Sequence, residues 1–248
     1  MKKTLLVIIM FALCVSMLLA QTADPPANGS GTSGDPYEIA TLNNLYWITQ
    51  NTGEWDKHYI QTEDIDASST SGWDGGNGFF PIGNYSTRFS GTYDGQDHTI
   101  DALFIDRAST DYVGLFGYAY YAEIVSIGVT NVDITGDGFV AGLTGNNSHS
   151  LISNNYSTGS VSGTDRVGGL VGENFSPISN SYSTGSVSGT GTYVGGLTGD
   201  NHHYVENSFW DMETSGQSTS DGGTGKTTVE MKDVATFTDL TTVGLDSP

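Results

Sequence analysis

Short alternations of apolar and small polar residues, separated by glycines, dominate the chain and predict β-strands. In "GSVSGT", which occurs at 159–164 and again at 185–190, a valine stands between two serines. This period of two is typical of a strand with one buried face. We therefore expect Val161 and Val187 to point inward and the flanking serines to point outward.

The strand pattern recurs at a fixed interval. "VGLFG" at 113–117 is followed by "VAGLTGNN", "VGGLVGEN" and "VGGLTGDN", whose central leucines are Leu143, Leu170 and Leu197. Counted from Leu115, the leucine spacings are 28, 27 and 27 residues. A second repeat interleaves with the first, because "NNYSTGSVSGT" at 154–164 returns as "NSYSTGSVSGT" at 180–190.

A period near 27 residues without a helical signal predicts stacked coils. We predict an all-β fold, a right-handed parallel β-helix (β-solenoid) of about six coils with short helical caps. Leu143, Leu170 and Leu197 should form one internal stack, since each coil can bury its apolar side only against its neighbours. The coils would lie about 4.8 Å apart, and each buried rung would contribute roughly 1.5–3 kcal/mol.

Two series of asparagines recur at constant phase, and they are Asn147, Asn174, Asn201 and Asn154, Asn180, Asn207. Asparagine tolerates the left-handed conformation and bonds its own backbone at turns. Both rows are therefore predicted to lie at corners and to form amide ladders, although a sugar-binding row is an alternative. The "GG" before Leu170 and Leu197 allows a tight turn or a positive φ.

These repeats resemble the GLUG motif, which occurs in bacterial surface proteins, in regions flanking some immunoglobulin-A peptidases and in adhesin-like proteins. "FSGTYDGQDHTIDALFI" at 89–105 and "GDPYEIATLNNLYWI" at 34–48 resemble the segments that usually precede such repeats. The resemblance implies a parallel β-helix at a cell surface and no catalytic residues.

Helical patterns occur near both ends. Thr41 can cap a helix that reaches Gln50, and Thr227 with Glu230 forms a capping box before a stripe of three apolar residues. We expect a helix over 227–237 to fold over the open end of the last coil. The expected segments are a signal peptide (1–20), a flexible N-terminal segment (21–34), an N-terminal cap with the first coils (35–88), a GLUG-type solenoid (89–210), and a C-terminal loop with a capping helix (211–248). The end at Pro248 suggests either a fragment or a shortened family member.

The basic, then apolar, N-terminus is typical of a signal peptide, so we expect a secreted or cell-surface protein with no membrane insertion after cleavage. The single cysteine, Cys14, would leave with the peptide, and the remaining chain would carry 6 Lys and Arg against 28 Asp and Glu, a net charge of −22. This charge excludes ordinary nucleic-acid binding. Solubility outside the cell explains it most simply, and cation binding is the sharper alternative.

Few residues form a pattern that chemistry would need. "DIDASS" at 64–69 begins like an EF-hand, but the sixth position is Ser69 and the twelfth is Gly75, so only a looser calcium site among Asp64, Asp66 and Asp74 remains. "GGTGKTT" at 222–228 lacks the first glycine of a phosphate loop. We expect no other metal, no cofactor and no catalytic residue.

The rival hypothesis is a β-helix carbohydrate-active enzyme, either a polysaccharide lyase or a hydrolase. A hydrolase needs two carboxylates in one groove, but Asp133 and Asp165 lie at different phases of the repeat. A lyase acting on acidic sugars would need positive charge, and Arg166 is the one Lys or Arg between 108 and 225. We therefore expect a non-enzymatic adhesin or structural scaffold whose partner is a glycan or a host or matrix protein.

Overall fold

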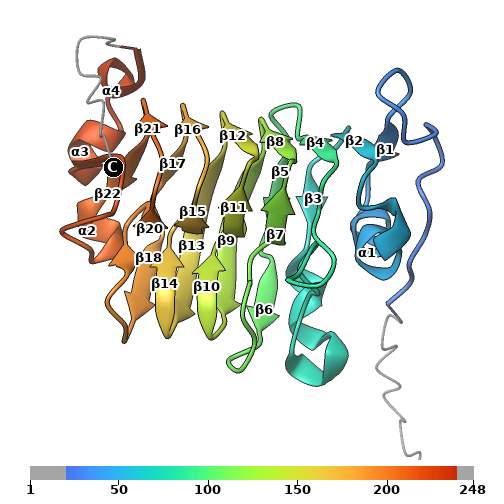
Figure 1. The fold of residues 1–248 in the computed structure, drawn as a ribbon, viewed down its shortest axis with the longest axis horizontal. Helices are drawn as coiled ribbons and strands as arrows, with labels where there is room; N and C mark the ends of the chain where they lie inside the picture. The colour runs from blue at the N-terminus through green and yellow to red at the C-terminus, as the bar shows by residue number, and fades with distance from the viewer. Residues whose placement is uncertain (1–20, 239–248) are drawn as a thin grey trace, which may run out of the picture.

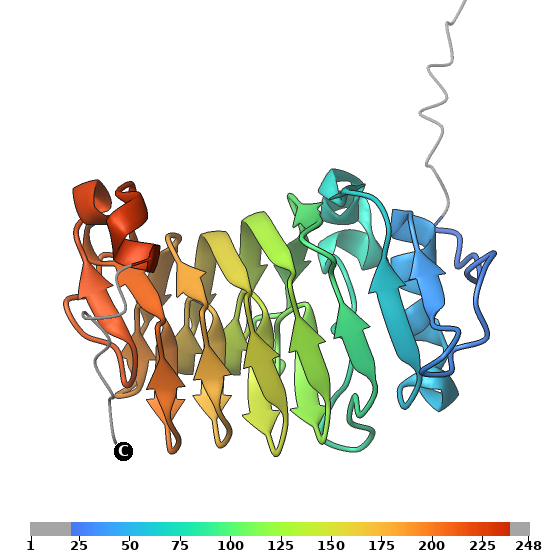
Figure 2. The same ribbon diagram turned by 90° about the horizontal axis from the view of Figure 1, so that it is seen from above.

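The computed structural model describes residues 21–238, and the chain is a parallel β-solenoid. Figure 1 shows the coils rising one after another from helix α1 (Leu42–Gln50) at one end to the last strands at the other. The same stack is seen from above in Figure 2. The predicted all-β architecture is confirmed. The predicted signal peptide (1–20) and residues 239–248 lie outside the described residues.

The strands form four sheets within the described residues, and every ladder between them is parallel. The seven-stranded sheet contains β1 (Tyr37–Ile39), β2 (His58–Gln61), β4 (Thr92–Asp94), β8 (Glu123–Val125), β12 (Leu151–Ser153), β16 (Ile178–Ser179) and β21 (Val205–Glu206). The four-stranded sheet contains β7 (Phe116–Tyr120), β11 (Thr144–Ser148), β15 (Val171–Asn174) and β20 (Thr198–Asn201). The three-stranded sheet contains β10 (Gly138–Ala141), β14 (Asp165–Gly168) and β19 (Val194–Gly195).

The nine-stranded sheet forms the remaining side. It contains β3 (Ile65–Asp66), β5 (Thr99–Asp101), β6 (Phe104–Asp106), β9 (Gly128–Thr135), β13 (Tyr156–Gly163), β17 (Tyr182–Ser183), β18 (Ser186–Gly189), β22 (Phe209–Asp211) and β23 (Thr224–Lys226). Val161 lies opposite Val187 in its register, as the repeat predicts. Both valines are buried, and the serine hydroxyls of Ser160 and Ser186 bond to each other on the outer face.

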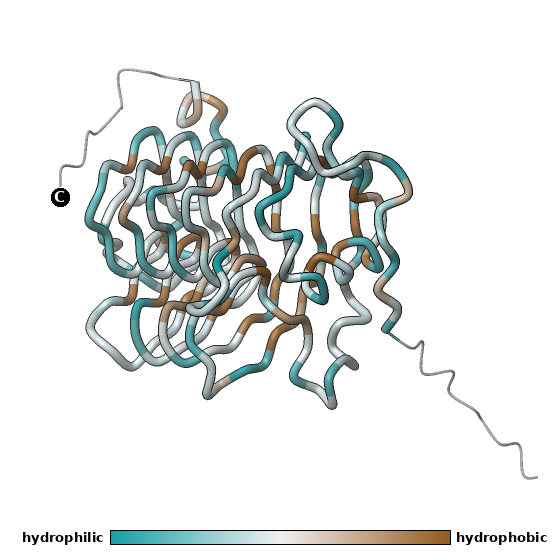
Figure 3. The backbone as a smooth tube through the Cα atoms, turned by 45° about the vertical axis from the view of Figure 1, so that its right-hand side comes forward, coloured by the Kyte–Doolittle hydropathy of each residue, from teal (hydrophilic) through white to brown (hydrophobic). Residues whose placement is uncertain are grey.

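The core is a column of apolar side chains inside the stacked coils. Leu143, Leu170 and Leu197 are fully buried, and backbone hydrogen bonds link each to the next, so the predicted leucine stack is confirmed. Apolar segments recur at similar positions of successive coils in Figure 3.

The predicted number of coils is too high. About four coils contribute a strand to the four-stranded sheet, from β7 to β20. The N-terminal strands β1 and β2 continue the seven-stranded sheet. Within residues 21–238, their coils contribute no strand to the three-stranded or four-stranded sheet. Helix α1 and the 3₁₀ turns η1 (Thr52–Glu54), η2 (Ser68–Gly72) and η3 (Asp74–Gly76) take the place of the missing strands.

The paired glycines are required for close approach and not for a positive φ. A Cβ at Gly168 would lie 2.0 Å from the carbonyl oxygen of Val171, and one at Gly169 would lie 2.1 Å from the hydroxyl of Ser183. The left-handed positions of these coils are held by bulkier residues, such as Phe139 and Arg166.

The two asparagine rows have different roles. Asn147, Asn174 and Asn201 point inward and form an amide ladder, in which each Nδ2 donates to the next Oδ1 at 2.8 and 2.7 Å. Residues 154, 180 and 207 instead adopt φ values of 57°, 50° and 47°. The first row therefore confirms the predicted ladder, and the second confirms the predicted left-handed turn.

At the N-terminal end, α1 begins as predicted, since the Thr41 hydroxyl accepts a hydrogen bond from the Asn44 amide at 3.2 Å. The C-terminal end differs from the prediction. The capping box of Thr227 and Glu230 is present, but two short helices follow it, α3 (Thr228–Met231) and α4 (Val234–Thr238). The break has a local cause, because the Asp233 carboxylate accepts the Ala235 amide and starts a new turn.

These helices do not cover the open coil. Val234 is exposed, and Phe237 packs against Tyr182 and Phe209. The last coil is covered by the segment after α2 (Met212–Ser215) instead. There the Ser220 hydroxyl accepts hydrogen bonds from the Leu197 and Thr198 amides at 3.1 and 2.9 Å.

Candidate functional site

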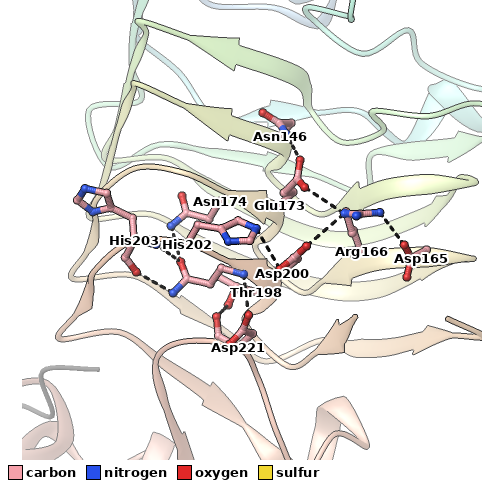
Figure 4. Close-up of polar contacts among 11 residues, drawn as sticks. Asn146, Asp165, Arg166, Glu173, Asn174, Thr198, Asp200, His202, His203 and Asp221 are labelled. Carbon is pink, nitrogen blue, oxygen red and sulfur yellow. Dashed lines mark hydrogen bonds and ion pairs between the residues drawn. The ribbon is translucent and has the colours of Figure 1, made fainter. Parts of the chain in front are cut away.

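A row of polar side chains crosses three coils on the four-stranded sheet. Asn146, Glu173 and Asp200 occupy the same register position of β11, β15 and β20. They are the variable residue in "GNN", "GEN" and "GDN", so the repeat places a different side chain at one point of each coil. All three are largely buried. Figure 4 shows them one above another.

Arg166 on β14 lies beside this row, between the row and Asp165 (Figure 4). Its Nε is 3.0 Å from Glu173 Oε1 and 3.2 Å from Asp200 Oδ2, and its Nη1 is 2.7 Å from Asp165 Oδ2. The guanidinium also lies over the rings of Phe139 and Tyr193. The guanidinium therefore forms ion pairs with three carboxylates. Without these pairs, the buried negative charges would destabilise the fold.

The environment shifts the protonation of the central carboxyl. Burial raises the pKa of Glu173, Asp200 raises it further, and Arg166 opposes both effects. Asn146 Nδ2 donates a hydrogen bond to Glu173 Oε2, which holds the side chain in the row.

A metal would have to compete with the arginine. Within residues 21–238, Glu173, Asp200 and His202 form the one group of potential ligand atoms that lie within 4.8 Å of one another. Asp200 Oδ1 is 3.2 Å from His202 Nε2, but its other oxygen pairs with Arg166. A cation placed here would face the guanidinium at close range. The geometry is therefore that of an ion-pair network that joins neighbouring coils.

The three calcium candidates are engaged separately. Asp64 Oδ1 accepts the Thr99 amide at 2.8 Å, and this bond lowers the pKa of Asp64. Hydrogen bonds from the Ser68 side chain and from its amide, which lies 2.9 Å from Asp66 Oδ1, lower the pKa of Asp66. Asp74 pairs with Arg107 at 2.9 Å. The structure does not bring these three carboxylates into the group described above.

Other residues singled out in the sequence also lie apart. Residues 224–226 of "GGTGKTT" form β23, which pairs with β22. Asp133 is on β9 of the nine-stranded sheet, whereas Asp165 is on β14 of the three-stranded sheet. His202 stacks on Phe175 and His203 contacts Tyr204.

A second surface feature lies where the four-stranded and seven-stranded sheets meet. A groove of about 570 Å³ opens there, and we call it the corner groove. Its lining includes Tyr121, Glu123, His149, Leu151, Phe175 and His203. Four of these residues, Tyr121, His149, Leu151 and Phe175, belong to three successive coils and are exposed. One irregularity in the repeat is the signal that could have revealed this groove, because Asn154 follows Asn147 by seven residues whereas Asn180 follows Asn174 by six.

Comparisons with known proteins agree with the repeat pattern. The GLUG motif model matches residues 163–188. Halomucin of Haloquadratum walsbyi is 40% identical over 151 residues, which are 60% of this chain and 2% of that protein. A putative Gly-rich membrane protein of Evansella cellulosilytica is 35% identical over 129 residues, 49% of this chain and 14% of that protein. The chain thus spans a small fraction of these relatives.

No solved structure matches the chain. Within residues 21–238, no helix has the length and apolar character needed to cross a membrane. The motif match lies on β13 to β18 and includes the stacked Leu170. The chain therefore carries a GLUG motif within a β-solenoid fold.

Proposed function

We propose that this chain is an exported surface module that acts as an adhesive scaffold by binding and not by catalysis. The observation that carries the proposal is the arginine-centred network. The one cluster of acidic and histidine side chains in the described residues has Arg166 paired to Glu173 and Asp200. A general acid and base need free carboxylates at a defined separation around a substrate. These carboxylates are instead used to join coils.

The relatives support a role at a surface. One is named a halomucin and the other a membrane protein, and both are much longer than this chain. A solenoid suits such a role because its stacked coils present long lateral faces that can contact an extended partner. The acidic composition favours a soluble surface in contact with the external medium.

Coated beads test this proposal. Beads carrying residues 21–248 are applied to immobilised polysaccharides and matrix proteins, and beads carrying the Leu170→Asp variant serve as the unfolded control. Retention of the first beads alone is the expected result. The proposal fails if neither bead is retained by any surface, or if the protein degrades a polysaccharide and loses this activity on a single carboxylate change.

A further inference from the structure

The corner groove displays large apolar side chains that remain exposed in the described chain. Tyr121 is 63% exposed, Phe175 is 42% exposed and Leu151 is 41% exposed. Exposed apolar residues are ordinary when they are scattered, but a contiguous group in a groove marks a binding surface. These three line one groove.

The corner is built differently in two of the coils. Four residues separate Ala119 from Ile124 and Asn147 from Ile152, whereas three separate Asn174 from Ile178, although these positions are in register. Each of these two longer corners contains one residue in the left-handed conformation, Tyr121 with φ 56° and His149 with φ 54°. Histidine adopts this conformation more readily than most residues, whereas it is unfavourable for the bulky Tyr121. Their rings lie 5.0 Å apart in the groove, with an angle of 38° between the ring planes.

Charge determines which class of ligand the groove can accept. Glu123 is the one acidic residue that lines it, and no Lys or Arg is among its lining residues. The whole chain carries a net charge of −20. An anionic polymer would be repelled, and so would a second copy of this chain. A neutral ligand with apolar faces and hydroxyl groups is not repelled by this charge.

We propose that the corner groove binds a neutral glycan chain that lies along the solenoid axis. Tyr121, His149 and Phe175 come from three successive coils, and the rings of Tyr121 and His149 lie 5.0 Å apart. Pyranose rings have apolar C–H faces that pack on aromatic rings, and aromatic side chains combine this packing with low conformational cost. His149 Nδ1 lies 3.1 Å from the Ser148 hydroxyl, so its Nε2 is the atom that can bond a sugar hydroxyl. The Glu123 carboxylate supplies an acceptor at the same groove.

This inference rests on the proposed function and names its ligand and its site. The test measures binding of residues 21–248 to arrayed cellohexaose, chitohexaose, mannohexaose and maltohexaose, with anionic glycans and matrix proteins as further surfaces. The variants are Tyr121→Ala and Phe175→Ala. The matched control is Tyr85→Ala, because Tyr85 is 64% exposed and lies outside the groove. Thermal melting of each variant checks that the fold is intact.

We expect at least one neutral glycan to bind. Each groove variant should weaken its binding by about tenfold or more, as for an aromatic residue central to an interface, and Tyr85→Ala should leave it unchanged. Equal binding by wild type and groove variants would overturn the inference. Binding confined to proteins or anionic glycans would also overturn it while leaving the adhesive function standing. Absence of binding to every surface would overturn both.

Discussion

Replacement of Asn174 by alanine should destabilise the solenoid strongly, although it removes no apolar contact. The Asn174 side chain is fully buried. Its Nδ2 donates to Asn201 Oδ1 and to the Ser176 carbonyl, both at 2.7 Å, and its Oδ1 accepts from Asn147 Nδ2 at 2.8 Å. Asn174→Ala therefore leaves polar atoms without partners in the coils above and below.

Each buried polar atom that loses its partner costs about 1–3 kcal/mol. Four atoms lose a hydrogen bond, and three of them, Asn147 Nδ2 and the amide and carbonyl of Ser176, have no other partner in the described part of the chain, since Asn201 Oδ1 still accepts the His203 amide. We therefore expect a loss of at least about 3 kcal/mol in the free energy of unfolding. For a domain of this size, that corresponds to a decrease in Tm of about 6–12 °C. The measurement is thermal unfolding of residues 21–248 by circular dichroism.

The outer asparagine row supplies the control. Asn180 has a φ of 50° and is exposed, and glycine adopts this conformation without strain. Asn180→Gly should change the free energy of unfolding by less than about 0.5 kcal/mol. If Asn174→Ala melted within a degree of the wild type, the inner ladder would not stabilise the coils and the reasoning would be refuted.

Three further predictions concern the core, the ion pairs and the end of the solenoid. Leu170→Asp should bury an unpaired charge and collapse the middle coils, and an unchanged melting curve would contradict the stacking of the leucines. The pKa of Glu173 is raised in the folded protein, so protonation of this carboxyl favours folding. The stability of the wild type should therefore fall relative to that of Glu173→Gln as the pH rises from the unfolded-state pKa near 4.5 through the folded-state pKa. A difference in Tm between these two proteins that is constant from pH 4 to pH 8 would disprove this. A chain ended at 218 should self-associate in sedimentation, because the Leu197 and Thr198 amides lose Ser220 and open strands pair, whereas a chain ended at 226 should remain monomeric.

The repeat itself was predictable because each coil must place the same side chains inside. Leu143, Leu170 and Leu197 recur at nearly constant spacing, and the period of two around Val161 assigned the inner face correctly. The number of coils was not predictable, since the N-terminal coils lack the motif and replace strands with α1 and short turns. The prediction of one helix over 227–237 was wrong because the Asp233 carboxylate accepts the Ala235 amide and starts a second helix.

The ion-pair network was hidden for a different reason. Arg166 and Asp200 are 34 residues apart, and only the stacking of coils brings them together. Arg166 stands out in the sequence as an isolated cation, and Glu173 and Asp200 are variable positions of the repeat. No sequence pattern indicates that Arg166 pairs with these two carboxylates. The corner groove depends on a one-residue difference in corner length between coils. A difference this small does not by itself indicate a groove in a sequence repeat.

The most direct test of the proposed function measures binding and turnover together. Residues 21–248 are incubated with each immobilised polysaccharide, and bound protein and released sugar are quantified in the same wells. We predict saturable binding to at least one neutral polysaccharide with no release of product. Release of product that disappears in a Glu173→Gln or Asp200→Asn variant, while binding persists, would contradict the proposal that this chain binds without catalysis.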